Sequence, residues 1–171
     1  MSKNILFLSC IVTALSISGC QSDAIESKQT NSSKKQVVLA KDKLNICQDA
    51  VASVEKQLNK IDRVKVESSE ILNQNYPYHP KGRPNNYKLV ISGDEANAVM
   101  NNDILLNSLA TQIINNCDSI SLVRFNLYFT GYILEYGLMP DGTVKKFQCP
   151  AGFKIGEPYP RPLEWGEQCS P

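Results

Sequence analysis

The first twenty residues set the conditions under which this chain folds. Lys3 is the single cation before an uncharged, largely apolar run over residues 5–17, which ends at Ser18-Gly19-Cys20. A charged start, a short apolar segment and small residues at its end are typical of an export signal. At about 1.5 Å per residue the run reaches roughly 20 Å, short of the roughly 30 Å hydrocarbon core of a bilayer. We therefore expect this segment to be removed rather than to span a membrane, and the remainder to fold in an oxidising compartment.

The end of the apolar run carries a more specific pattern. Ile17-Ser18-Gly19-Cys20 resembles the lipobox of bacterial lipoprotein precursors, although Ile17 stands where leucine is commonest. The resemblance implies a signal peptide over residues 1–19 and a mature N-terminus at Cys20 that carries diacylglycerol and palmitate. Two or three acyl chains anchor a protein stably to membrane lipid. Gln21 after the cysteine implies the outer membrane, facing the periplasm, in a Gram-negative host. The alternative is an ordinary signal peptide cut nearby, with Cys20 a free thiol.

Removal of 19 residues leaves 171 − 19 = 152, which suits one domain and a tail. The 42% of apolar and 20% of charged residues match ordinary globular usage. Lys and Arg number 18 against 17 Asp and Glu, so loss of Lys3 leaves 17 − 17 = 0. A neutral chain has no polybasic field for nucleic acid, and we expect no nucleic-acid partner.

A polar stretch separates the lipobox from the first helical pattern. Residues 20–42 are rich in Ser, Lys, Gln and Asn, with an apolar cluster only at residues 37–40. We expect this segment to be a flexible tether, because it has too little apolar surface to offset the entropy of ordering. Apolar residues then recur at helical spacing and predict a core-facing helix; they are Leu44, Cys47, Val51, Val54, Leu58 and Ile61.

The middle of the chain alternates between loop, strand and helix signals. Residues 73–86 carry three prolines and a glycine and predict a loop. Val64 and Val66 before it indicate at most a short strand, and residues 88–92 predict another. Ser92 to Glu95 matches a capping box that would start a helix. A second helical stripe follows the N-cap candidates at residues 101–103; its members are Leu105, Leu106, Leu109, Ala110, Ile113 and Ile114.

Alternating residues then predict three consecutive strands, over residues 121–130, 132–139 and 143–148. Val123, Phe125, Leu127 and Phe129 should share one face of the first. We therefore expect an α+β fold in a single domain over residues 43–149, with an antiparallel three-stranded meander, one further strand, and helices packed on one face. Residues 150–171 hold five prolines and three glycines and predict an extended tail over the surface.

Four cysteines lie in the predicted domain and tail, and three pairings are possible. The meander places Cys117 and Cys149 a strand length apart, too far for a disulfide. Of the remaining pairings we prefer Cys149 with Cys169 and Cys47 with Cys117, because the first pins the proline-rich tail. A zinc site is the alternative, but the chain has no C-x-x-C and His79 is its one histidine.

Motifs for catalysis are weak. Ser53 to Lys56 fits S-x-x-K, but no companion motif follows and the match lies inside a predicted helix. Glu135 is a candidate buried acid, yet alternation places it opposite Leu134 and Tyr136, which predicts a solvated sheet face. We expect no catalytic residue, no metal and no cofactor. The alternative is an enzyme of an unrecognised family, a hydrolase acting on envelope polymers through Glu135 and a second acid.

One stretch has the composition of a recognition loop. Aromatic rings, cations and backbone-stiffening prolines combine between residues 76 and 87. We expect a non-enzymatic binding or assembly module that engages an envelope protein or a glycan through this loop. The alternative is a rigid surface loop whose rings fold onto the domain. The residues predicted to bind the partner are Tyr76, Tyr78, His79, Lys81, Arg83 and Tyr87.

Overall fold

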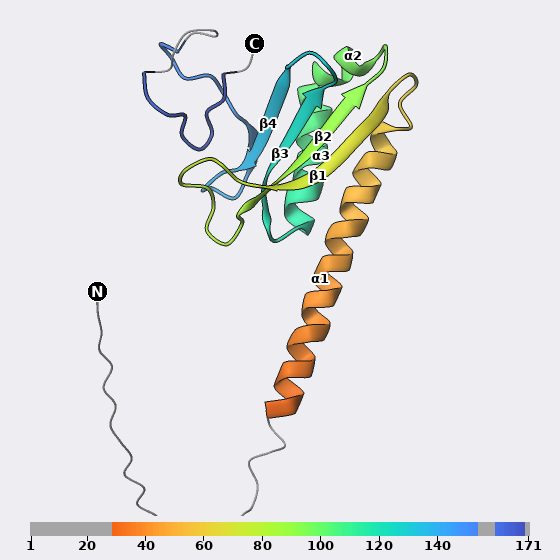
Figure 1. The fold of residues 1–171 in the computed structure, drawn as a ribbon, viewed down its shortest axis with the longest axis vertical. Coiled ribbons are helices and arrows are strands. Elements are labelled where there is room, and N and C mark those ends of the chain that lie inside the picture. The colour runs from red at the N-terminus through yellow and green to blue at the C-terminus, as the bar shows by residue number, and fades with distance from the viewer. Residues whose placement is uncertain (1–28, 154–159, 170–171) are drawn as a thin grey trace, which may run out of the picture.

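The computed structural model describes residues 29–153 and 160–169. The predicted signal peptide, Cys20, the first part of the tether and parts of the tail lie outside the described residues. Figure 1 shows one sheet with helices against one of its faces. None of the described helices combines the length and the apolar character needed to cross a bilayer. The elements are α1 (Gln29–Leu58), β1 (Lys65–Asn73), β2 (Asn85–Ser92), α2 (Ala96–Met100), α3 (Asp103–Asn116), β3 (Ile120–Leu127), β4 (Ile133–Leu138) and β5 (Val144–Lys146).

The sheet is mixed, with the strand order β1-β2-β3-β4-β5. β2 runs parallel to β3, and the other neighbouring pairs are antiparallel. The α+β class is confirmed. The prediction of one strand beyond the meander is wrong, because β1 adds another. β2 is parallel to β3 because α2 and α3 connect them, and a helical crossover returns the chain in its original direction.

β1 is the strand that the sequence pattern does not reveal. Val64 and Val66 suggested a short strand, whereas β1 continues to Asn73. Most of its residues are exposed, since it is the edge of the sheet and needs little apolar character. Charged side chains on an edge strand also oppose pairing with another sheet. The register with β2 sets Glu70 beside Lys88, and their ion pair measures 2.8 Å.

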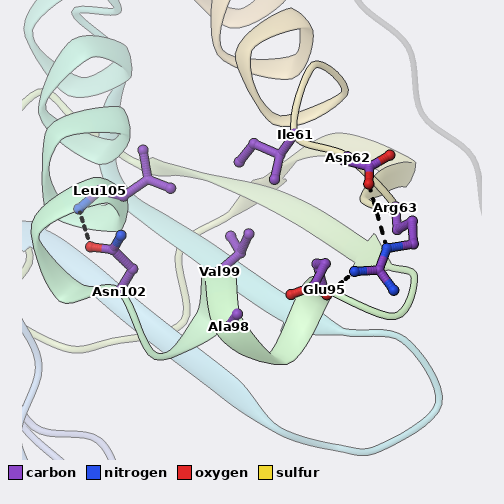
Figure 2. Close-up of a pocket in the computed structure, with 8 residues that line it drawn as sticks. All are labelled: Ile61, Asp62, Arg63, Glu95, Ala98, Val99, Asn102 and Leu105. Atoms are coloured by element: carbon purple, nitrogen blue, oxygen red, sulfur yellow. Dashed lines mark hydrogen bonds and ion pairs between the residues drawn. The ribbon is translucent and has the colours of Figure 1, made fainter.

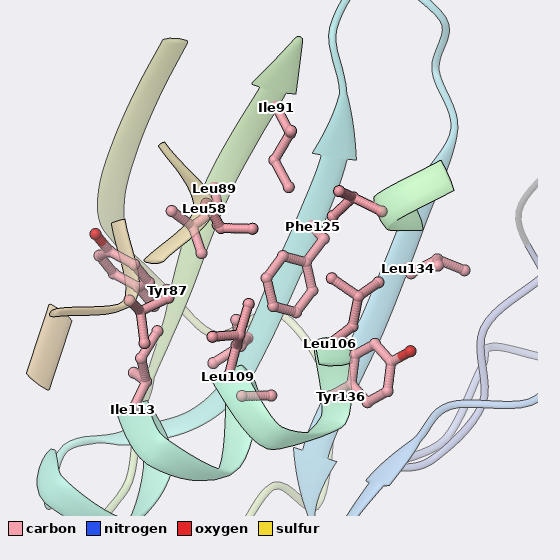
Figure 3. Close-up of a cluster of buried hydrophobic side chains, with 14 of the residues drawn as sticks. Leu58, Tyr87, Leu89, Ile91, Leu106, Leu109, Ile113, Phe125, Leu134 and Tyr136 are labelled. Atoms are coloured by element: carbon pink, nitrogen blue, oxygen red, sulfur yellow. The ribbon is translucent and has the colours of Figure 1, made fainter. Parts of the chain in front are cut away.

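The hydrophobic core fills the space between the sheet and helices α1 and α3 (Figure 3). Leu89 and Phe125 on the central strands are fully buried there. Burying such a side chain contributes roughly 1.5–3 kcal/mol. Leu44, the first member of the predicted α1 stripe, is instead 58% exposed. The two helical stripes supply the buried residues Val54, Leu58, Leu106, Leu109, Ala110, Ile113 and Ile114.

α1 corrects the prediction that residues 20–42 form a flexible tether, because the helix already begins at Gln29. Residues 29–42 contain neither glycine nor proline, and their Lys, Gln, Leu and Ala are good helix formers. Extending an existing helix costs far less than starting one, so the packed end of α1 supports its free end. Its 30 residues span about 45 Å, and Figure 1 shows the helix reaching well beyond the sheet.

The starts of α2 and α3 differ in how well the sequence predicts them. Asn102 caps α3, and its side chain accepts a hydrogen bond from a backbone N–H of the first turn. The predicted capping box at Ser92 is wrong: Ser92 belongs to β2, and Glu95 occupies the N-cap of α2 without a side-chain cap bond. Gly93 between them has φ 107°, and a Cβ there would lie 2.0 Å from the Arg63 carbonyl oxygen. The close approach of the Arg63 backbone therefore demands glycine.

Phe129 departs from the alternation that its neighbours follow. Val123 and Phe125 are fully buried in the core, and Leu127 packs against it. β3 ends at Leu127, so Phe129 lies in the turn beyond and is 90% exposed. The prediction that Phe129 shares the core face is therefore wrong.

Two disulfides tie peripheral segments to the domain. Cys47 on α1 pairs with Cys117, which follows the last turn of α3, and Cys149 pairs with Cys169. These are the two pairings preferred from the sequence. All four cysteines of the zinc alternative form disulfides in this structure. Among the described residues, no group of three or more His, Cys, Asp or Glu side chains is arranged to hold a metal ion.

Candidate functional site

The predicted recognition loop joins β1 to β2 and crosses the sheet toward β4 (Figure 1). It covers the sheet face opposite α1 and α3, where the C-terminal segment 160–169 also packs. Six residues between positions 76 and 87 were predicted to form one exposed partner-binding set. The structure divides this set into side chains that build the domain and side chains that face solvent.

Arg83 and Tyr87 belong to the group of side chains that build the domain. Nη1 of Arg83 donates to backbone carbonyls in the last turn of α3, at its C-cap and at the start of β3; the first of these is the Ile114 carbonyl, at 2.7 Å. The carbonyls of the last helical turn have no partner within the helix, so Arg83 caps the C-terminus of α3 and also ties it to β3. Tyr87 is 3% exposed in β2, and its hydroxyl donates to Glu55 of α1.

Tyr76 also folds onto the domain. Its ring meets Phe147 and Trp165 edge to face, with centroids 5.4 and 6.0 Å away, and those two rings lie 5.1 Å apart. Such aromatic pairs contribute roughly 0.5–1.5 kcal/mol each beyond their buried area. Gly137 of β4 lies beneath this cluster, and a Cβ there would come within 2.4 Å of the Phe147 ring. The absence of a side chain at Gly137 therefore lets the aromatic cluster sit directly on the sheet.

Tyr78 is the ring that remains outside. Its side chain is 88% exposed, and its φ of 60° lies in the left-handed region that bulky residues rarely adopt. It borders a groove of about 340 Å³ whose lining is mostly apolar. His79 lies near the groove, with its ring 6.5 Å from that of Trp165, and Lys81 is exposed. The residues that line the groove are Tyr78, Pro80, Leu138, Met139, Pro140, Gly142 and Trp165.

Glu135 occupies the opposite environment from the one predicted. It is 2% exposed, rather than solvated, because the loop and the C-terminal segment cover its face of the sheet. Its carboxylate accepts from Nε of Arg124 at 2.6 Å, from Nη2 of the same guanidinium, and from the Tyr76 hydroxyl. A buried carboxylate is tolerated where a cation and hydrogen-bond donors replace its lost water, and Glu135 has both.

The C-terminal segment attaches to β4 through side chains. β5 is only three residues long and leaves part of the β4 edge without a neighbour. Gln168 fills this place: its Oε1 accepts from the Glu135 N–H at 2.9 Å, and its Nε2 donates to the Ile133 carbonyl at 2.8 Å. Nε1 of Trp165 donates to the Leu138 carbonyl at 2.9 Å. Together with the Cys149–Cys169 disulfide, these bonds make the segment part of the site.

An ion pair, the Arg161–Glu167 clamp, stabilises the turn within segment 160–169. Arg161 binds Glu167 through two nitrogens, each 2.7 Å from a carboxylate oxygen. The Arg161 hydrogen bond, helped by the backbone N–H of Glu164, lowers the pKa of Glu167 to about 2. This carboxylate therefore stays ionised and keeps the clamp closed through all but strongly acidic pH.

No sequence motif indicates the residues that complete this face, namely Arg124, Phe147, Trp165 and Gln168. The preferred Cys149–Cys169 pairing was the available signal, since it implied that the tail returns to the domain. It carried no information on which strand the tail would cover.

A second hollow, of about 390 Å³, lies between the end of α1 and helix α2 (Figure 2). Its apolar floor includes Ile61, Val99 and Leu105. Arg63 at its rim pairs with Asp62 at 3.5 Å and with Glu95. The charged side chains at this rim are therefore paired with one another. None of the six residues predicted to bind a partner lines this hollow.

Comparisons with known proteins assign this chain to no family: no family model matches it, and no curated protein or solved structure is significantly similar to it.

Proposed function

We propose that this chain is a lipid-anchored envelope lipoprotein whose folded domain binds another envelope component, a protein or a glycan, and has no enzymatic activity. The observation that carries the proposal is the exposed Tyr78 ring beside an apolar groove shared with Trp165. Tyrosine and tryptophan offer large contact areas at low entropic cost, which is why they are enriched at recognition surfaces.

The structure of the loop favours recognition over mere surface cover. The backbone holds Tyr78 in a left-handed conformation, while the neighbouring Tyr76 is locked into the domain. Strained conformations persist where the surrounding structure enforces them, and they concentrate at functional sites. His79 and Lys81 add polar groups beside the apolar groove, the usual composition of a specific binding site.

The hydrolase alternative receives less support from the geometry around Glu135. Hydrolysis of a glycan by the common mechanisms uses two carboxylates flanking the scissile bond. The side chains that bind the Glu135 carboxylate among the described residues are Arg124 and Tyr76, and neither is an acid. With 2% exposure, this carboxylate serves the packing of the outer face.

Binding through the groove is tested with the full-length protein purified from membranes and immobilised. Tyr78→Ala should weaken capture of its envelope partner by roughly 5- to 150-fold, as expected for an anchor residue worth about 1–3 kcal/mol. Urea stability should stay unchanged, since the ring is 88% exposed. Ile104→Ala is the matched control, because Ile104 is 86% exposed at the start of α3, away from the groove. Lost stability with undiminished capture would contradict the proposal.

The anchor is tested separately. Cys20→Ala should abolish acyl labelling and partitioning into the detergent phase, because the thiol that receives the lipid is gone. In a Gram-negative host the unaltered protein should fractionate with the outer membrane. Continued palmitate labelling of the Cys20→Ala protein would show that the lipobox interpretation is wrong.

A further inference from the structure

A third pocket, separate from the Tyr78 groove, lies on the other side of the aromatic cluster. It has a volume of about 360 Å³. Tyr76 lines it and contacts Trp165, which lines the Tyr78 groove, so these two rings stand between the two hollows. The residues that line the pocket are Asn75, Tyr76, Pro77, Arg124, Pro162 and Leu163.

Arg124 is the one charged side chain among these lining residues. Glu135 engages its Nε and Nη2, whereas Nη1 has no acceptor among the described residues. The Arg124 side chain is 25% exposed and its carboxylate partner 3%, so the cation faces the pocket and the anion is buried behind it. The pocket therefore presents N–H donors of a fixed guanidinium, and none of its described lining residues carries a carboxylate.

The neighbouring strands keep Arg124 in this position. The sheet register aligns Glu70, Lys88, Arg124 and Glu135 across four strands. Lys88 is paired with Glu70 and Arg124 with Glu135, so each cation is held by its own carboxylate. A guanidinium fixed in this way loses little entropy when it binds an acceptor, and its hydrogen bonds to an anion are about twice as strong as neutral ones.

We propose that this pocket binds a small organic acid. The carboxylate of the ligand accepts hydrogen bonds from Nη1 of Arg124, and its apolar body packs against Pro77, Pro162 and Leu163. Glu135 is a positioning residue, because it orients the guanidinium without touching the ligand. This site is distinct from the one proposed at Tyr78 and does not depend on it.

The proposal is tested by NMR titration of the isotope-labelled full chain with 4-phenylbutyrate and with its neutral counterpart 4-phenylbutyramide. The acid should give saturable shifts at the Arg124 guanidinium and the Leu163 methyls at millimolar concentrations. The amide should bind at least about tenfold more weakly, since a charged hydrogen bond is replaced by a neutral one. Equal binding of acid and amide, or no saturable shift with the acid, would overturn the proposal.

Two variants separate loss of binding from loss of fold. Arg124→Gln with Glu135→Gln removes both charges and leaves no unpaired ion, and it should lose acid binding. Leu163→Glu, at a half-buried wall position, should reduce affinity at least about tenfold by repelling the carboxylate. Tyr78→Ala should bind the acid normally, even if the capture proposed for the groove fails. Undiminished acid binding by the double variant would refute the role of Arg124.

Discussion

Replacing Glu135 by leucine should cost the domain a large part of its stability, and most of that cost should disappear when Arg124 becomes methionine at the same time. Glu135 is 2% exposed and Arg124 retains 25% of its side-chain exposure. Removing one partner of a fully buried ion pair costs about 3–5 kcal/mol, and partial hydration of the remaining guanidinium lowers the expected loss to about 2–4 kcal/mol. The double replacement leaves no unpaired charge and should lie within about 1 kcal/mol of the original protein.

Urea unfolding followed by the fluorescence of Trp165, the one tryptophan of the chain, measures these differences. For a denaturant slope of about 2 kcal/mol per molar, a loss of about 2–4 kcal/mol moves the midpoint by roughly 1–2 M. The ring of Trp165 packs against Tyr76 and Phe147 and so reports on the same face of the sheet. Additive costs in the double variant, or single costs below about 0.5 kcal/mol, would refute the structural role of Glu135.

Other perturbations test the tail, the aromatic cluster and the core. Cys169→Ser opens a crosslink with a sequence separation of 20 and should cost about 3 kcal/mol in urea unfolding. Gly137→Ala drives a Cβ to within 2.4 Å of a ring and should cost about 1–3 kcal/mol. Burial, aided by hydrogen bonds to carboxylates, raises the pKa of Tyr87 and Tyr136 above the ordinary value. Their stabilisation is complete below about pH 10 and falls as pH rises further, so tyrosinate absorbance from both should appear only with unfolding.

The buried framework is the part of the fold that sequence patterns predict well. The stripe that includes Leu106, Leu109 and Ile113 predicts α3 because one face of the helix is buried along its whole length. The alternation of Val123 and Phe125 predicts β3 for the same reason. β1 has no such pattern because it is an edge strand and most of its residues are exposed. Apolar periodicity arises where one face of an element is buried. Elements with few buried residues lack this periodicity and are therefore not predicted by it.

The candidate site was harder to predict because its face of the sheet is covered by segments that lie far away in the sequence. Alternation correctly sets Glu135 opposite Leu134 and Tyr136, but it cannot tell that segment 160–169 folds back over that face. Tyr76 and Tyr78 stand two positions apart in similar sequence surroundings, yet one ring is packed and the other exposed. The two rings differ in exposure because the chain reverses at the loop and because Phe147, far along the sequence, contacts the Tyr76 ring.

Photocrosslinking in living cells shows directly whether the domain engages a partner at the Tyr78 groove. A photoreactive amino acid is placed at position 78 in one strain and at position 104, equally exposed but distant from the groove, in another. We expect a discrete adduct of defined mass from position 78 and none from position 104. The same adducts from both positions, or no adduct from position 78, would contradict this expectation.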